Sequence, residues 1–279
     1  MNTSTSVVRI CLVVVTAFFL DIAPLAQAPT PAPQDTYKPT VGMPGKDAVW
    51  VPSSDAMVEK MLDVAKVTPK DFVMDLGSGD GRTIIAAAKR GAHALGVEYN
   101  NDLVELSKRA AASAGVADKA SFVQGDMYAA DISKATVLAL FLLPANLQKL
   151  ESKFLDLKPG SRIVANTFWI PDWSADETFT MQNDCDSWCT VQLFIIPAKV
   201  QGKWRLDQGE LSLTQSYQMV SGTLTSSGTS TPVQGRLRGD QITFTAGNAQ
   251  YSGQVNGSSM RGTLKSGATS MSWSATRAR

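Results

Sequence analysis

The sequence has 279 residues but only one histidine and three cysteines, and these shortages exclude several kinds of site. A single histidine, His93, argues against a histidine-based metal cluster or a Ser-His-Asp triad. Outside the N-terminal segment only Cys185 and Cys189 remain, which is half of a structural zinc set. We therefore predict no metal site. The formal net charge of +1 gives no support for a strongly basic nucleic-acid binder, so we predict no nucleic-acid partner.

The N-terminal segment has the pattern of an export signal. Arg9 supplies a weakly positive start, residues 10–20 are apolar, and Ala26-Gln27-Ala28 is a small-x-small cleavage pattern. The apolar run is too short for an ordinary membrane-spanning helix. We predict a signal peptide over residues 1–28 and a periplasmic or secreted protein; an uncleaved N-terminal membrane anchor is the alternative.

Cleavage after Ala28 would leave Cys185 and Cys189 as the only cysteines. In an oxidising compartment an isolated pair four residues apart favours a disulfide. Two unpaired thiols remain the alternative.

Residues 75–81 read Asp-Leu-Gly-Ser-Gly-Asp-Gly between a short apolar run and a helical pattern. Strand, glycine turn and helix in this order build a nucleotide pocket beside a helix N-terminus. A dinucleotide fingerprint would need a glycine at Arg82, so the spacing indicates a different ligand. The pattern resembles the first motif of class I S-adenosylmethionine methyltransferases. A glycine-rich turn of another α/β protein is the competing interpretation.

Strands and helices alternate after residue 55, which predicts a doubly wound, Rossmann-like α/β sheet. Its helices begin at Ser54, Arg82, Asn100 or Asn101, and Pro144. The predicted strands lie near residues 72–74, 94–97, 122–124, 136–142, 162–168 and 190–197. Glu98 ends the second strand about twenty residues beyond the glycines, where a ribose-binding carboxylate belongs. We place this domain at residues 46–199, after a proline-rich linker at residues 29–45.

Three short stretches give a more specific resemblance. They are residues 51–54 (Val-Pro-Ser-Ser), residues 75–82, and residues 141–144 (Phe-Leu-Leu-Pro) followed by Leu150-Glu151. The region from Trp50 to Phe168 resembles the group that contains the mitochondrial ATP-synthase c-subunit lysine methyltransferases and their bacterial relatives. This resemblance covers somewhat under half of the chain.

The resemblance implies S-adenosyl-L-methionine as cofactor and methyl donor, and it assigns a part of the donor to each candidate residue. Asp75, Gly77, Ser78 and Gly79 would hold the methionine part, and Glu98 the ribose. Asp126 would meet the adenine amino group, while Met127 covers the ring. The hydroxyl of Ser53 or Ser54 would reach the donor carboxylate.

The resemblance also implies a protein lysine as the substrate, but the sequence departs from the related amine methyltransferases at one point. Many of these carry an Asn/Asp-Pro-Pro-aromatic motif after the fourth strand, whereas this chain has Leu142, Leu143 and Pro144. Leu143 and Pro144 would contact the substrate through backbone carbonyls. Trp50, Trp169 and Trp173 could contact a cationic substrate, although plain packing competes with this role. Asp172 and Tyr128 are weak candidates for a base, so we assign no catalytic residue.

Residues 200–279 change character: glycine, serine and threonine dominate, and no helical period appears. A repeat of the form apolar-x-Gly-x-apolar recurs at Gly222, Gly235, Gly253 and Gly262. About eight short alternating strands predict a small antiparallel barrel or sandwich that folds independently.

Two other functions remain open on the sequence alone. Exported proteins meet little S-adenosylmethionine, so the chain could be a non-catalytic binding protein on a methyltransferase fold. It could also be a small-molecule methyltransferase. The sequence does not predict an oligomeric state.

Overall fold

The computed structural model describes residues 1–3, 37–207 and 209–278. The predicted signal peptide lies outside the described residues except for its first three, and so do residues 29–36 of the predicted linker. Residues 37–279 form one compact unit. None of the helices in the described part of the chain has the length and apolar character needed to span a bilayer.

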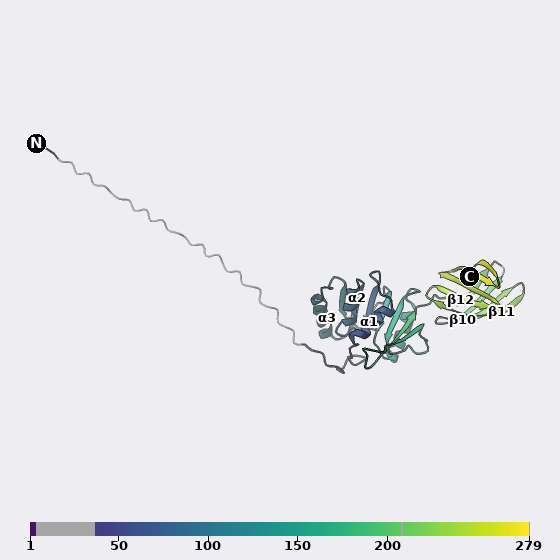
Figure 1. Ribbon diagram of the computed structural model, residues 1–279, viewed down its shortest axis with the longest axis horizontal. Coiled ribbons are helices and arrows are strands. Elements are labelled where there is room, and N and C mark those ends of the chain that lie inside the picture. The colour runs from purple at the N-terminus through teal and green to yellow at the C-terminus, as the bar shows by residue number, and fades with distance from the viewer. Residues whose placement is uncertain (4–36, 208, 279) are drawn as a thin grey trace. The chain divides into compact units, whose positions relative to one another are not determined.

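A seven-stranded sheet organises the first half of this unit (Figure 1). Its strands are β1 (Phe72–Leu76), β2 (His93–Glu98), β3 (Ala120–Gln124), β4 (Val137–Leu140), β5 (Arg162–Asn166), β6 (Glu177–Thr180) and β7 (Thr190–Ile195). The strand order is β3-β2-β1-β4-β5-β7-β6, and β7 runs antiparallel to both of its neighbours. The strands from β3 to β5 are parallel. The predicted doubly wound sheet is confirmed, and its order reverses between β1 and β4, where such sheets bind ligands.

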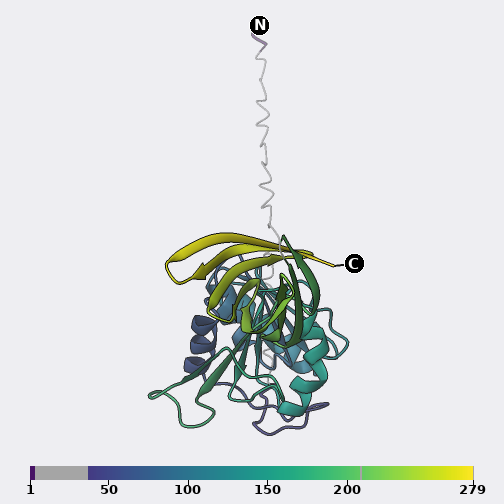
Figure 2. The same ribbon diagram turned by 90° about the vertical axis from the view of Figure 1, so that its right-hand side faces the viewer.

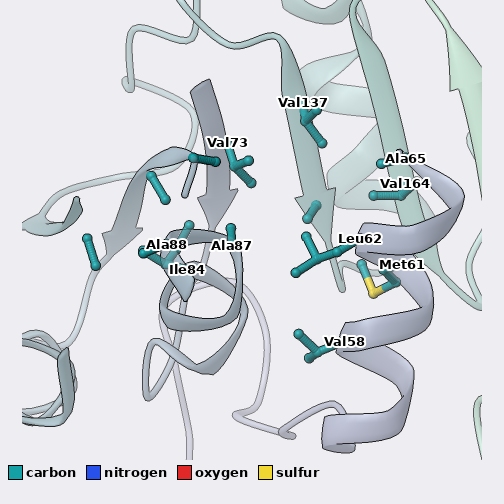
Figure 3. Packing of buried hydrophobic residues seen from close by; sticks show 14 of the residues in the cluster. Val58, Met61, Leu62, Ala65, Val73, Ile84, Ala87, Ala88, Val137 and Val164 are labelled. Atoms are coloured by element: carbon teal, nitrogen blue, oxygen red, sulfur yellow. The ribbon is translucent and has the colours of Figure 1, made fainter. Parts of the chain in front are cut away.

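Three helices cover one face of the sheet. They are α1 (Asp55–Val64), α2 (Arg82–Lys89) and α3 (Asn101–Ser113). Ser54 starts α1, because its hydroxyl accepts a hydrogen bond from the Met57 amide at 3.2 Å. Figure 3 shows side chains of α1 and α2 packed with Val73, Val137 and Val164 of the central strands. This apolar layer anchors the helix N-termini beside the carboxyl ends of the strands.

The opposite face is covered by α4 (Pro144–Leu155), drawn in teal in Figure 2. Leu147, Leu150 and Phe154 are fully buried against the sheet. Pro144 is the first residue of this helix, as the sequence predicts, and Leu143 precedes it as the N-cap. With apolar layers on both faces, the central strands β1 and β4 carry almost continuous apolar side chains.

Residues after β7 form a closed, eight-stranded antiparallel barrel, which confirms the barrel rather than the sandwich. Its strands are β8 (Gly202–Leu206), β9 (Gly209–Ser216), β10 (Met219–Ser226), β11 (Thr229–Arg238), β12 (Gln241–Ala246), β13 (Ala249–Asn256), β14 (Ser259–Ser266) and β15 (Thr269–Arg277). Closure comes from pairing of β15 with β8, for example Ala275 with Leu206. Alternate side chains fill the interior around the fully buried Trp204. Closing the sheet removes its exposed edges.

The barrel contacts the sheet region through side chains near its rim. Tyr217 stacks on Trp173 with ring centroids 5.1 Å apart, and its hydroxyl lies 3.1 Å from a Glu151 oxygen. Arg236 pairs with the buried carboxylate of Asp176 at 2.7 Å. The predicted boundary between residues 199 and 200 falls between β7 and β8. These contacts add shared packing that the prediction of two independent units did not include.

Residues 42–50 form a short hairpin, although the sequence predicts linker as far as residue 45. Pro44 and Val49 are bridge partners, and the Gly42 amide donates to the Trp50 carbonyl across the same turn at 2.8 Å. The folded region therefore begins before Lys46. This hairpin matters because it lies against the pocket described next.

Candidate functional site

A pocket opens at the carboxyl ends of β1, β2 and β4, at the point where the strand order reverses. The glycine turn after β1 forms one wall. The Gly77 and Ser78 amides donate to the Val97 carbonyl at 2.7 and 3.1 Å, which ties this turn to β2. Gly79 has φ +56°, and a Cβ there would lie 2.6 Å from Nε1 of Trp50. Only glycine fits this place without displacing a neighbour.

Glu98 fixes the other side of the glycine turn. Its Oε2 accepts from the Gly79 amide and its Oε1 from the Asn100 amide, each at 2.9 Å. The side chain is buried and lines the pocket. A carboxylate can accept more bonds than these two. Glu98 can therefore hold the turn and still accept a hydrogen bond from a ligand hydroxyl.

Asp75 lies at the end of β1 with only 6% of its surface exposed. Burial, with a smaller contribution from the Glu98 charge, raises the pKa of Asp75 to about 8. A hydrogen bond with Thr83 acts in the opposite direction. A cationic group beside Asp75 would favour the ionised form. The carboxyl group is thus placed to take up a ligand ammonium at the pocket wall.

Asp126 and Met127 line the pocket from the loop after β3. Asp126 accepts from the Tyr128 amide at 2.8 Å and pairs with Lys46 of the 42–50 hairpin at 2.5 Å. The hydrogen bond from Lys46 lowers the pKa of Asp126, with help from the Tyr128 amide. Lys46 also lies over the Tyr99 ring, 5.3 Å from its centroid. The hairpin is thereby held over this end of the pocket.

The structure gives different roles to the two serines, Ser53 and Ser54, that the sequence offers as contacts for the donor carboxylate. Ser53 lines the pocket, and its hydroxyl accepts from Asn166 Nδ2 at 3.0 Å. Its carbonyl accepts from Arg82 at 2.7 Å, while the Arg82 guanidinium also binds both oxygens of Asp80. Ser54 is exposed, is not among the lining residues, and caps α1. Only Ser53 is in a position to touch a ligand.

The predicted substrate residues lie outside the pocket lining. Leu143 and Trp169 are 46% and 57% exposed, and neither they nor Pro144 line the pocket. Phe141 and Leu142 line it instead. The predicted fourth strand includes these two residues, whereas β4 ends at Leu140. The chain turns there, and the turn brings the Phe141 side chain to the pocket.

Several site residues carry little or no signal in the sequence. Lys46 lies within the predicted domain without a predicted role, and Trp50 is predicted only as a substrate contact. Asn166, 1% exposed, ends β5 and does not itself line the pocket, but it donates to the pocket residue Ser53, and no described group bonds its Oδ1. A polar residue at the end of a buried strand is the signal that identifies Glu98, and it could have identified Asn166. The weak base candidates Tyr128 and Asp172 do not line the pocket.

Comparison with known proteins agrees with this geometry. A family model described as the ANTKMT methyltransferase domain matches residues 75–177. The chain is 39% identical over 150 residues to a protein-lysine N-methyltransferase of Saccharolobus islandicus, spanning 53% of this chain and 92% of that protein. It is 36% identical to the mouse enzyme that methylates lysine in the ATP-synthase c-subunit, over 46% of this chain, and it spans about half (52%) of that relative.

A solved structure gives the same result. The crystal structure of an RNA methyltransferase from Salinibacter ruber in complex with S-adenosyl-L-homocysteine is 41% identical, with a TM-score of 0.50. The match covers 54% of this chain and 96% of that one.

The chain belongs to the class I S-adenosylmethionine-dependent methyltransferases, in the family of the Saccharolobus islandicus enzyme. It is therefore an enzyme with S-adenosyl-L-methionine as its cofactor, as the sequence motifs indicate.

Proposed function

We propose that this methyltransferase N-methylates a lysine side chain of a protein. The observation that carries the proposal is the joined arrangement of Asp75, Gly79 and Glu98 around one pocket, in a chain related to a protein-lysine N-methyltransferase. A buried acid and a glycine without room for a Cβ fit the methionine part of the donor, and a hydrogen-bonded carboxylate fits its ribose.

The donor residues are assigned as follows. Asp75 would hold the ammonium of the methionine part, and the backbone of residues 77–79 would lie against it. Glu98 would accept from the ribose hydroxyls, and Asp126 from the adenine amino group, with Met127 against the ring. Ser53 would bind the donor carboxylate. The structure supports this set because all of these residues line the same pocket.

When bound, the donor supplies a methyl group activated by a sulfonium. The chain then has to align a neutral amine with that methyl group, and alignment alone can supply much of the rate. A lysine amine has a pKa of about 10.4 in water, so it must lose a proton or its pKa must fall. Desolvation lowers an amine pKa. Phe141 and Leu142 provide the apolar wall for this desolvation.

Asn166 is a buried polar residue at the end of β5, the strand that pairs with β4, after which the amine-orienting motif is missing. Its Nδ2 bonds Ser53, a pocket residue, while no described group bonds its Oδ1. An amide oxygen can accept from an amine N–H and orient the nitrogen lone pair. We assign Asn166 this orienting role.

The test offers two acceptor classes to the purified chain with S-adenosyl-L-methionine: a lysine-rich protein and a structured RNA, because one relative is an RNA methyltransferase. Mass spectrometry of intact protein and of digested RNA would detect added methyl groups. Methylation of lysine in the protein, absent in Glu98→Ala, is the expected result. Methylation confined to the RNA would overturn the lysine assignment while leaving the methyltransferase class intact.

We also propose that the protein is exported through residues 1–28. The disulfide between Cys185 and Cys189 supports this location, since disulfides persist in oxidising compartments. Fractionation of expressing cells would test it: the mature chain should lack its first 28 residues and be found outside the cytoplasm. A full-length chain confined to the cytoplasm would contradict the proposal.

A further inference from the structure

An aromatic cluster borders the pocket at Phe141. The Phe141 ring stacks with Phe168 and meets Trp188 edge-on, with ring centroids 5.7 Å apart in each case. Phe168 follows β5, while Trp188 comes from the loop between β6 and β7. Phe141 itself lines the donor pocket. Three separate segments of the sequence therefore bring aromatic rings together beside the donor pocket.

Trp188 lies in a loop that is closed by a disulfide, and its backbone is in the left-handed region. Its φ is +57°, a left-handed conformation that costs energy for a residue with a side chain. Cys185 and Cys189 flank it and form a disulfide, as the cysteine pairing predicts. The Met181 amide donates to the Cys189 carbonyl at 2.8 Å, which closes the base of this loop. Trp188 is nevertheless 44% exposed, so burial alone does not explain its position.

A strained residue with a large, half-exposed ring beside a pocket suggests a role in binding. The lysine stem is an apolar chain of methylene groups, and such stems pack along apolar surfaces. An aromatic face beside the stem also removes water from the amine, which favours its neutral form. The ring at this position therefore meets the two needs of an amine acceptor.

We propose that Trp188, held against Phe141 by the Cys185–Cys189 disulfide, is a positioning residue for the acceptor lysine side chain. This inference rests on the proposed function, since it names the residue that receives the acceptor of that reaction. The inference assigns donor binding and acceptor binding to two different parts of the site. The glycine turn holds the donor, and the disulfide loop holds the acceptor, so the loop can be altered without a change in donor affinity.

The experiment measures binding rather than turnover, so it does not depend on knowing the natural protein substrate. Two analogues of S-adenosyl-L-homocysteine are compared by calorimetry, each with nitrogen in place of sulfur. In one the nitrogen carries a methyl group, and in the other an aminoalkyl arm that imitates the lysine side chain. The ratio of the two affinities measures the contribution of the arm.

In the oxidised wild-type chain the arm should strengthen binding. Trp188→Ala should remove about tenfold of this gain, because it deletes an aromatic contact. Affinity for the methyl analogue should stay the same, which also shows that the donor pocket is intact. Trp188→Phe should keep most of the gain. Met271→Ala is the matched control, since Met271 is a 51% exposed apolar residue on the barrel; it should change neither affinity.

The disulfide is tested in the same way. A dithiol reductant supplies two electrons and two protons, so the disulfide becomes two thiols while the dithiol becomes a cyclic disulfide. The reduced wild type and the Cys185→Ser, Cys189→Ser double variant should both lose the arm contribution and keep affinity for the methyl analogue. The reductant should have no effect on the double variant.

Three outcomes would overturn the inference: an arm that adds nothing in the oxidised wild type, an arm contribution unchanged by Trp188→Ala, or equal loss for both analogues. Equal loss would mean that Trp188 only supports the fold. Failure of the wild type to bind the methyl analogue is a different result, because it would remove the donor site and with it the proposed function.

Discussion

At the carboxyl edge of the sheet, two carboxyl groups are buried and several polar atoms have no partner, whereas the barrel interior is lined by apolar and aromatic side chains. Every unpartnered buried polar atom found among the described residues belongs to the sheet region, and two of them are Asn166 Oδ1 and Thr167 Oγ1. An unpartnered buried polar group costs about 1–3 kcal/mol, and one of these atoms, Ser78 Oγ, belongs to a residue that lines the pocket. Thr167 also has a φ of +57°, which is rare for a β-branched residue.

The two regions also use glycine for different reasons. Gly79 lies in a turn with positive φ, beside the space for a ligand. Gly262 lies within a barrel strand, where a Cβ would be 1.8 Å from the Ser252 carbonyl oxygen. Glycine therefore leaves room beside the ligand pocket at the sheet edge, whereas in the barrel it allows neighbouring strands to approach closely.

The largest expected effect is the loss of donor binding in Gly79→Val. The new side chain would meet the Trp50 ring and occupy the pocket wall, so affinity for S-adenosyl-L-homocysteine should fall roughly 100-fold or more. Gly257→Val is the matched control, because Gly257 has φ +57° with nothing within 4 Å of its Cβ position. It should cost about 1–2 kcal/mol of stability and leave the affinity unchanged. Equal binding by both variants would place the donor elsewhere.

A second prediction concerns pH and Asp75. Because the pKa of Asp75 in the unliganded protein is about 8, the group is mostly protonated at pH 6 and cannot attract an ammonium. Affinity for S-adenosyl-L-homocysteine should therefore rise by about tenfold per pH unit from pH 6 towards 8. Titration calorimetry in two buffers should detect proton release on binding. Asp75→Asn should bind weakly at every pH; a pH dependence that survives in this variant would remove Asp75 from the role.

The same raised pKa has a consequence for the unliganded chain. The folded state holds a proton on Asp75 that the unfolded state loses near its ordinary pKa of about 3.9. This contribution to stability is therefore present at low pH and is lost as pH rises through about 8. Urea unfolding between about pH 4 and pH 8 should show the free energy of unfolding falling as pH rises. In Asp75→Asn the free energy of unfolding should depend less on pH.

The third prediction addresses the barrel. Gly262→Ala forces the backbone of β13 or β14 to move, so it should lower the free energy of unfolding by about 3 kcal/mol. The folded fraction should bind S-adenosyl-L-homocysteine as tightly as the wild type. Urea unfolding followed by calorimetry would check both statements. A variant of normal stability with impaired binding would reverse the assignment of the two regions.

The smallest effect is expected at the contact between the barrel and the sheet region. Tyr217→Phe removes the hydrogen bond to Glu151 but keeps the stack on Trp173, so it should cost about 1 kcal/mol. Donor affinity should not change. A drop in affinity measured by calorimetry would mean that the barrel influences the site.

Much of the fold could be predicted because it is encoded locally. Alternating strands and helices specify the sheet, Ser54 marks the start of α1, and period-two alternation identifies the barrel strands. The choice between barrel and sandwich could not be predicted, because closure depends on pairing β15 with β8 at opposite ends of the segment.

The residues of the site also fall into those that the local sequence predicts and those that depend on contacts between distant parts of the chain. Asp75, Glu98 and Asp126 each lie within two residues of the end of a strand, so their position can be predicted from the neighbouring sequence. Lys46 meets Asp126 across 80 residues, and Asn166 meets Ser53 across 113. No local period encodes such contacts. Ser54 has the right residue type for a ligand contact, but the helix cap uses its hydroxyl instead.

The central claim is that the pocket at the ends of β1, β2 and β4 is the donor site. Calorimetric titration of the full chain with S-adenosyl-L-homocysteine, beside Gly79→Val and Gly257→Val, tests it most directly. The account predicts one site with micromolar affinity in the wild type and in Gly257→Val, and an affinity weaker by roughly 100-fold or more in Gly79→Val. Absence of binding in the wild type, or full binding in a folded Gly79→Val, would contradict it.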